Sequence, residues 1–238
     1  MNEEFPVKND RESVLTYEQV YQFLDQGYLH ARALVGPEIC RRADDTMLAM
    51  LGTSRDDRST WGQVRRDTFT EHPELMGMYT PSLLRAAGQL ASEDPHMFPV
   101  SRVPTNAYII AIPPSDEPWK HHGGHMDGAG DMKTNIVSSF PPPWSIFAMI
   151  YLHDVESQGG ATMVWPGSHR KFQSLLRSQP ERYKFMAQLA ADADQLDLGE
   201  PVELLAQAGD VLFVDQKTWH AGSRNKGYRP RLAMNMKW

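Results

Sequence analysis

The chain has 238 residues, of which 41% are hydrophobic and 23% charged, a composition that suits one folded domain and excludes a disordered chain. Its net charge of −6 disfavours a nucleic-acid or other polyanionic partner. The single cysteine, Cys40, excludes both an intrachain disulfide and a zinc site built from several cysteines.

No targeting or membrane segment is evident in the sequence. The N-terminus Met-Asn-Glu-Glu is acidic and lacks the basic and then apolar run of a signal peptide. The longest strongly apolar run, residues 146–152, is too short to cross a bilayer. We therefore expect a cytoplasmic protein without a membrane partner; the sequence does not indicate an oligomeric state.

The first hundred residues are predicted to be mainly helical. Thr16 and Gln19 form a capping-box pattern ahead of an apolar stripe at helical spacing, which ends at Gly27. Gly36 and Pro37 open a second predicted helix, in keeping with the preference of proline for the first helical turn. The predicted helices cover 16–27, 36–52 and roughly 70–92, the last interrupted by Pro81, and the polar segment 53–68 is predicted to be a loop.

The rest of the chain is predicted to be mainly β. The predicted strands are 107–112, 144–152, 161–165, 202–205, 211–214 and 231–238, and they are separated by glycine and proline turns. Segment 144–152 is apolar on both alternating faces, which indicates a strand covered on both sides. Residues 169–195 favour helix and are expected to lie outside the sheet.

This order of elements predicts the fold class. Helices followed by many short strands indicate an α+β domain with a double-stranded β-helix (jelly-roll, cupin-like) barrel and the N-terminal helices packed on one of its faces. We expect one domain over residues 1–238. In it, residues 1–100 form a mainly helical support and residues 101–238 form the barrel that carries the site.

His125 and Asp127 are the first candidate metal ligands. In an extended strand, residues i and i+2 point to the same side, so both side chains can reach one ion while Met126 faces away. Gly124 and Gly128 on either side allow a close approach of the backbone to a ligand. With His220 from a neighbouring strand, they form the two-histidine, one-carboxylate set of iron(II) oxygenases, which leaves coordination positions open for oxygen and a co-substrate.

Arg231 is the candidate anchor for that co-substrate. A dicarboxylate that chelates the metal at one end needs its far carboxylate neutralised, and a guanidinium group does this with two hydrogen bonds. Alternation along the last strand puts Arg231, Ala233 and Asn235 on one face, and Arg229 is the competing candidate.

The ordered set of motifs resembles the phytanoyl-CoA dioxygenase family of iron(II)- and 2-oxoglutarate-dependent oxygenases, over nearly the whole chain. The matching segments are 16–29, His-Met-Asp-Gly at 125–128, Gly-Gly-Ala-Thr at 159–162, Pro-Gly-Ser-His at 166–169, Gly-Asp-Val-Leu-Phe at 209–213, His-Ala-Gly at 220–222 and Arg-Pro-Arg at 229–231.

The resemblance implies His125, Asp127 and His220 as iron ligands, Arg231 as the 2-oxoglutarate anchor and Thr162 as a further co-substrate contact. It implies Fe(II), 2-oxoglutarate and O2 as cofactor and co-substrates, with release of succinate and carbon dioxide as an aliphatic C–H bond of a small-molecule substrate is oxidised. One departure stands out: many relatives carry a polar side chain where this chain has Gly123. Asp127 favours hydroxylation over halogenation, because a halide would need the position of the carboxylate.

Two other functions are compatible with the same residues. A zinc hydrolase can use a His-Asp-His site but has no need of Arg231, and a non-catalytic jelly-roll protein can bind a small ligand without the metal set. Desaturation, ring closure and peroxide formation stay open as reaction outcomes, and the substrate is not specified. His121 and His122 are expected near the site entrance, His169 in a structural role, and Trp61, Arg65 and Arg66 in a loop.

Overall fold

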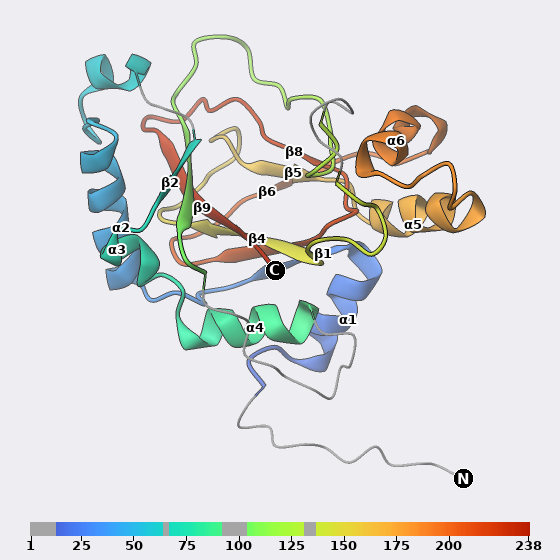
Figure 1. Cartoon of the computed structure of the whole chain (residues 1–238). Helices are drawn as coiled ribbons and strands as arrows, with labels where there is room; N and C mark the ends of the chain where they lie inside the picture. The colour runs from blue at the N-terminus through green and yellow to red at the C-terminus, as the bar shows by residue number, and fades with distance from the viewer. Residues whose placement is uncertain (1–12, 64–66, 92–103, 131–136) are drawn as a thin grey trace.

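Two antiparallel sheets form the centre of the protein, as seen in a computed structural model that describes residues 13–63, 67–91, 104–130 and 137–238 (Figure 1). The larger sheet has the strand order β1 (Tyr28–Ala31), β7 (Val211–Asp215), β4 (Ile146–Tyr151), β9 (Arg231–Lys237), β3 (Ala107–Ile112), β2 (Asp67–Thr70). The smaller sheet has the order β6 (Val202–Leu204), β5 (Thr162–Val164), β8 (His220–Ala221). The prediction of a mixed helical and β protein is confirmed.

The helices fall into two groups along the chain. The N-terminal group comprises α1 (Tyr17–Gln26), α2 (Pro37–Met50), the 3₁₀ helix η1 (Arg58–Gln63), α3 (Pro73–Met76) and α4 (Pro81–Ala91). The second group, α5 (Ser168–Ser178), α6 (Met186–Ala191) and η2 (Ala193–Gln195), lies beside the smaller sheet, and α5 contacts α1 of the first group (Figure 1). This second group is the predicted helical excursion outside the sheet. No helix in the described part of the chain is long and apolar enough to span a membrane.

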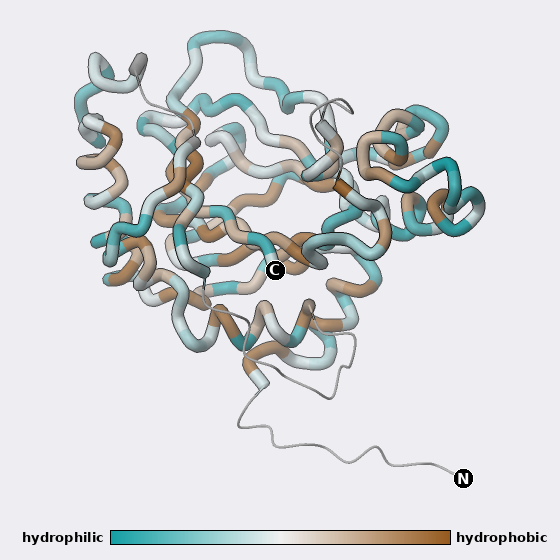
Figure 2. Tube along the Cα trace, in the orientation of Figure 1, coloured by the Kyte–Doolittle hydropathy of each residue, from teal (hydrophilic) through white to brown (hydrophobic). Residues whose placement is uncertain are grey.

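Strand β4 has a different hydrophobic neighbourhood on each face, as its sequence predicts. Ile146, Ala148 and Ile150 belong to a core that also contains buried residues of α1, α2 and α4. Phe147, Met149 and Tyr151 belong to a second core, shared with residues of β5 and β6 in the smaller sheet. In Figure 2 the hydrophobic residues gather along these central strands, whereas the long loop after β3 is mostly hydrophilic. The second face of β4 therefore looks into the space between the sheets.

The capping signals at the start of the chain are confirmed. The backbone N–H of Gln19 donates to the Thr16 hydroxyl at 3.3 Å, and the Gln19 side chain accepts from the backbone N–H of Thr16 at 2.9 Å. Gly27 ends α1 with φ = 79°, the left-handed conformation that favours glycine. A Cβ at Gly27 would also lie 2.3 Å from Nδ1 of His169, so a second reason keeps this position free of a side chain.

Two of the predicted assignments are wrong, and a third is confirmed. Segment 53–68, predicted as loop, contains η1 and the start of β2; β2 is an edge strand, formed by pairing with β3 rather than by its own sequence. The predicted interruption of the helical region 70–92 is confirmed: the region consists of two helices, and Pro81 begins the second one, where its missing N–H costs nothing. His125 and Asp127 do not lie on a strand: His125 forms an isolated bridge with His220, and Asp127 sits in the turn that follows.

Candidate metal centre

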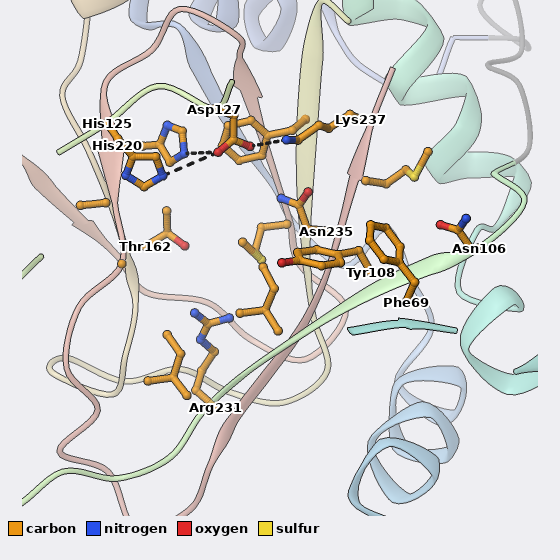
Figure 3. A pocket seen from close by; sticks show the side chains of 17 residues that line it. Phe69, Asn106, Tyr108, His125, Asp127, Thr162, His220, Arg231, Asn235 and Lys237 are labelled. Carbon is orange, nitrogen blue, oxygen red and sulfur yellow. Dashed lines mark ion pairs between the residues drawn. The ribbon is translucent and has the colours of Figure 1, made fainter. Parts of the chain in front are cut away.

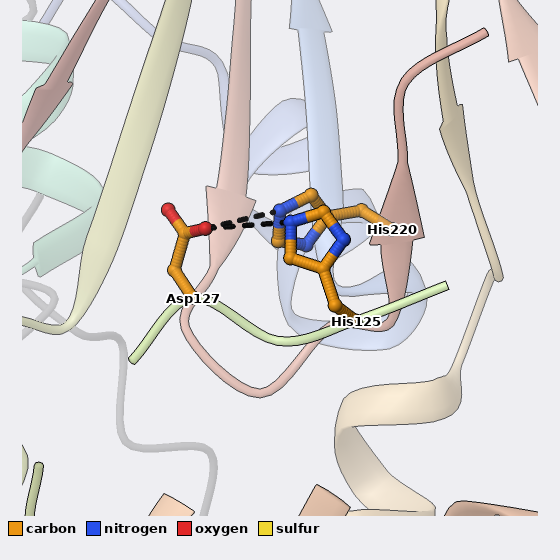
Figure 4. A group of neighbouring side chains, drawn as sticks. All are labelled: His125, Asp127 and His220. Carbon is orange, nitrogen blue, oxygen red and sulfur yellow. Dashed lines mark ion pairs between the residues drawn. The ribbon is translucent and has the colours of Figure 1, made fainter. Parts of the chain in front are cut away.

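His125, Asp127 and His220 converge on one point between the two sheets (Figure 4). Their candidate ligand atoms all lie within 4.8 Å of one another, and no other group of metal-ligating side chains in the described residues meets the same criterion. Nε2 of His125 and Nε2 of His220 each lie 3.6 Å from Oδ1 of Asp127. Two imidazole nitrogens and one carboxylate oxygen therefore face a common centre.

Backbone pairing fixes the two histidines relative to each other. The N–H of His125 donates to the carbonyl of His220 at 2.8 Å, and the reverse bond measures 3.0 Å. Their rings lie 4.4 Å apart between centroids. The turn after His125 then brings Asp127 back toward the rings, while Met126 is buried on the other side among residues of α5 and α6. The predicted orientation of Met126 is confirmed, but a turn produces it instead of strand alternation.

Hydrogen bonding sets the protonation pattern that metal ligands need. Nδ1 of His220 lies 3.0 Å from the carbonyl of Thr218, so this nitrogen donates and Nε2 keeps its lone pair toward Asp127. Burial raises the pKa of Asp127, but the two imidazoles beside its Oδ1 and the charge of Lys237 outweigh this effect, and the pKa lies well below its ordinary value. The carboxylate is thus ionised and the ring nitrogen is available for a cation.

The three residues open onto a cavity of about 600 Å³. The cavity lies between the sheets, because strands β3, β4 and β9 of the larger sheet and β5 and β8 of the smaller sheet all contribute to its walls. The His125 side chain is 52% exposed, whereas that of His220 is only 7% exposed, so a ligand reaches the centre from the His125 side. In Figure 3 the metal-ligand candidates lie at one end of this cavity and Arg231 at the other, with Thr162 between them.

Arg231, the first residue of β9, carries a buried positive charge that lacks a carboxylate partner among the described residues. The residue is 2% exposed; its Nε donates to the carbonyl of Gly160 at 3.0 Å, and its Nη1 is buried without a hydrogen-bond partner. Burial lowers the pKa of Arg231, yet a guanidinium stays charged. A buried charge without a partner is costly, and a carboxylate bound in the cavity would relieve that cost.

Thr162 is buried between the metal-ligand candidates and Arg231 (Figure 3). Its hydroxyl oxygen accepts a hydrogen bond of 2.9 Å from the hydroxyl of Tyr151 and lines the cavity. The bond from Tyr151 leaves the Thr162 proton free to be donated to a ligand.

Arg229 is in a different environment, although it lies only two residues before Arg231. Its Nη2 contacts both carboxylate oxygens of Asp44 in α2, at 2.6 and 2.8 Å, and it does not line the cavity. The competing candidate for the anchor is therefore committed to an ion pair elsewhere.

The other histidines singled out in the sequence lie away from the cavity walls. His121 packs edge-on against Trp165 with the rings 5.5 Å apart, and neither His121 nor His122 lines the cavity. The backbone N–H of His122 donates to the carbonyl of Gly222, which does line it, and the placement of both histidines near the entrance stays a prediction. His169 makes the expected structural contact, with Nε2 at 3.1 Å from the carbonyl of Leu24 at the end of α1. Trp61 is buried and donates to the carbonyl of Ser54; Arg65 and Arg66 lie outside the described residues.

Sequence reasoning missed Lys237. Its Nζ lies 3.0 Å from Oδ2 of Asp127, so it occupies the carboxylate oxygen that the histidines leave free. The alternation that places Arg231 and Asn235 on one face extends to residue 237, and this signal would have found it.

Comparisons with known proteins agree with this geometry. A model of the phytanoyl-CoA dioxygenase (PhyH) family matches residues 23–233. A search of curated protein sequences finds no significant match.

Among solved structures, the fold is similar to those of several oxygenase-like enzymes. The α-ketoglutarate-dependent carbocyclase SnoK from nogalamycin biosynthesis is 23% identical with a TM-score of 0.61, covering 94% of this chain and 83% of its own. The epimerase SnoN, in complex with Fe³⁺, α-ketoglutarate and nogalamycin RO, is 17% identical with a TM-score of 0.59, covering 92% and 80%. HygX from Streptomyces hygroscopicus, with nickel and 2-oxoglutarate bound, is 20% identical with a TM-score of 0.55, covering 93% and 85%. With a family match over most of its length, the chain belongs to the phytanoyl-CoA dioxygenase family.

Proposed function

We propose that this protein is an Fe(II)- and 2-oxoglutarate-dependent oxygenase that hydroxylates an aliphatic C–H bond of a small molecule and releases succinate and carbon dioxide. Family membership supports the enzyme class, and solved structures with the same fold contain a metal ion with 2-oxoglutarate or α-ketoglutarate. We interpret the two sheets as a double-stranded β-helix with α1, α2 and α4 on one face, and residues 1–238 as one domain. The core shared by these helices and the larger sheet supports this interpretation.

One observation carries the proposal: a His-Asp-His group shares a single cavity with a buried arginine whose Nη1 has no hydrogen-bond partner among the described residues. The donor set of two imidazoles and one carboxylate suits Fe(II) and leaves open positions on the ion. A thiolate ligand is not available, since Cys40 is buried elsewhere and burial raises the pKa of its thiol to about 11. Arg231 at the far end has the charge and the free N–H group that a dicarboxylate requires.

The residues of this chain would bind and orient the reactants. The iron would be held by His125, Asp127 and His220. Arg231 would bind the far carboxylate of 2-oxoglutarate, and Thr162 would donate a hydrogen bond to this co-substrate. When bound, iron with 2-oxoglutarate and O2 supplies the oxidising chemistry. Apolar side chains such as Phe147 and Met149 exclude water from the centre.

The wall opposite the metal ligands suggests which part of the substrate binds there. Phe69 of β2 is 68% exposed yet lines the cavity, and its ring lies 4.7 Å from that of Tyr108 between centroids. Asn235 is 7% exposed on the same wall, and no hydrogen-bond partner of its amide is found in the described residues. This combination favours a substrate with an apolar or ring-shaped face and a hydroxyl or carbonyl group that the amide can bind.

Two alternatives make different demands on the cavity. A zinc hydrolase would use the three ligands but would leave Arg231 buried without a partner. A non-catalytic binding protein would have no use for an ionised carboxylate facing two imidazoles.

The test is spectroscopic. Under anaerobic conditions, adding Fe(II) and 2-oxoglutarate to the protein is expected to produce a weak visible charge-transfer band, which zinc with its filled d shell does not give. His220→Ala should abolish the band, whereas His121→Ala, outside the cavity, should retain it. A wild-type protein that binds Fe(II) and gives no band with 2-oxoglutarate would refute the proposal.

A further inference from the structure

Lys237 holds one of the two oxygens of the Asp127 carboxylate. Its Nζ lies 3.0 Å from Oδ2, whereas Oδ1 faces the two histidines at 3.6 Å each. The two oxygens of one carboxylate therefore have separate partners (Figure 3). Lys237 ends β9, the strand that begins with Arg231, so a single strand reaches both ends of the cavity.

The ammonium group is fixed by more than this ion pair. It lies 4.5 Å from the centroid of the Trp144 ring, a cation–π contact that restricts where Nζ can go. The backbone beside it is also paired, because the N–H groups of Ser145 and Ile146 both donate to the carbonyl of Trp238. An exposed lysine usually gives up rotamer freedom for little gain in an ion pair, but here the ring and the strand already restrict the side chain.

The turn that carries Asp127 packs on the same tryptophan. Gly128 has φ = 82°, and a Cβ on it would lie 3.2 Å from Cη2 of Trp144 and 3.0 Å from Val137. Trp144 thus touches the turn behind Asp127 on one side and the ammonium of Lys237 on the other. The carboxylate, the lysine and the ring form one packed unit beside the metal ligands.

We propose that Lys237 is a positioning residue that binds the outer oxygen of Asp127 and keeps the carboxylate in single-oxygen contact with the metal. This inference rests on the proposed function. A carboxylate that is free to turn can present both oxygens to a cation, and would then occupy a coordination position that 2-oxoglutarate or oxygen needs. Partners of metal ligands commonly change metal affinity or activity by about 10–100-fold when they are removed.

Lys237→Met and Lys237→Arg separate this role from a simple effect of charge or folding. Met has a similar length but no positive charge, and Arg keeps a donor for Oδ2. The matched control is Lys226→Met, because Lys226 is an exposed lysine that contacts backbone carbonyls outside the cavity.

The first readout is the visible absorption of the Co(II)-loaded protein, whose shape and intensity follow the coordination number. The second is the affinity of the metal-loaded protein for 2-oxoglutarate. Lys237→Met should alter the Co(II) spectrum before 2-oxoglutarate is added and should weaken 2-oxoglutarate binding about 10-fold. Lys237→Arg should restore both, and Lys226→Met should match the wild type.

Identical Co(II) spectra for the wild type and Lys237→Met, with 2-oxoglutarate affinities within about twofold, would overturn the positioning role even if the variant were less stable. A failure of the proposed function would give a different experimental result. A wild-type protein that binds Co(II) without binding 2-oxoglutarate would refute the oxygenase assignment, and the Co(II) spectra of the variants would still decide whether Lys237 orients Asp127. A wild-type protein that binds no Co(II) would overturn both.

Discussion

At the scale of single residues, Arg231 and Arg229 show how burial and partners separate two identical side chains. Arg229 forms an ion pair with Asp44, while the buried Nη1 of Arg231 lacks a partner in the described part of the chain. A buried guanidinium without a carboxylate partner lowers the stability of the fold, and a carboxylate ligand bound beside Arg231 would offset this loss. The difference cannot be read from the Arg-Pro-Arg motif, because it depends on which side chain of α2 lies nearby.

Arg231→Ala is expected to weaken 2-oxoglutarate binding by roughly 2–5 kcal/mol, the usual cost of removing one partner of a buried charge pair. Arg229→Ala is the matched control: it should lower stability by breaking the pair with Asp44 and leave the 2-oxoglutarate affinity of the folded protein unchanged. Titration of each metal-loaded variant with 2-oxoglutarate measures both. Equal losses of affinity in the two variants would show that Arg231 is not the anchor.

At the scale of elements, the turn between β6 and β7 shows how one side chain joins distant segments. Asp210 is 1% exposed and accepts hydrogen bonds from the backbone N–H groups of Gln207 and Ala33, both at 2.9 Å. It also contacts Nε2 of His30 in β1 at 2.8 Å. Asp210 thus shapes the turn, and its link to β1 arises from the register of β1 against β7.

Asp210→Ala should destabilise the protein by about 2–4 kcal/mol, because it leaves two backbone N–H groups without their acceptor. Asp154→Ala is the control: Asp154 is exposed and accepts one bond near the same turn, from the N–H of Ala208, so its loss should cost about 1 kcal/mol or less. Urea unfolding midpoints compare the two. Similar losses would mean that the contacts of Asp210 with β1 contribute little.

Much of the element order could be predicted, because most of the elements carry a local signal. The capping box at Thr16, the doubly apolar β4 and the turn at Gly209 and Asp210 are properties of neighbouring residues. Edge strand β2 and the two-residue strand β8 have no such signal, since each forms by pairing with a strand that is distant in sequence.

At the scale of the whole molecule, the site could be predicted in its chemistry but not in its geometry. The residue types and their order identify His125, Asp127 and His220, and the cavity brings them together with Arg231. The bridge between His125 and His220 and the buried Nη1 of Arg231, which has no hydrogen-bond partner in the described residues, depend on how distant segments pack together. The contact of Lys237 with Trp144 depends on the pairing of β9 with β4 in the larger sheet. The spacing of these residues along the chain does not predict these contacts.

Stability of the whole fold should depend on pH through His153, which joins the end of β4 to the start of β9. The N–H of Leu232 donates to Nε2 of His153 at 3.0 Å, and Nδ1 lies 2.9 Å from the carbonyl of Asp154, so the neutral ring satisfies both contacts. A protonated ring could give Nε2–H to the carbonyl of Pro230 at 3.1 Å, but it would lose Leu232. Burial, followed by the positive charge of Arg229, lowers the pKa of His153 to about 4, against the opposing effect of Asp44.

The sign of the pH dependence follows from this shift. Between pH 6.5 and 4 the unfolded chain binds a proton at His153 that the folded chain does not, so this stability is fully present above pH 6.5 and is lost as the pH falls toward 4. The full loss in the free energy of unfolding is about 3 kcal/mol, because each unit of difference between the folded and unfolded pKa corresponds to about 1.4 kcal/mol. His153→Gln, which keeps an acceptor for Leu232, should flatten the decline in unfolding free energy between pH 7 and 4.5 relative to the wild type. If the unfolding free energy of His153→Gln declines as steeply as that of the wild type, another group governs the acid sensitivity, and the partly buried His30, whose pKa burial also lowers, is the next to substitute.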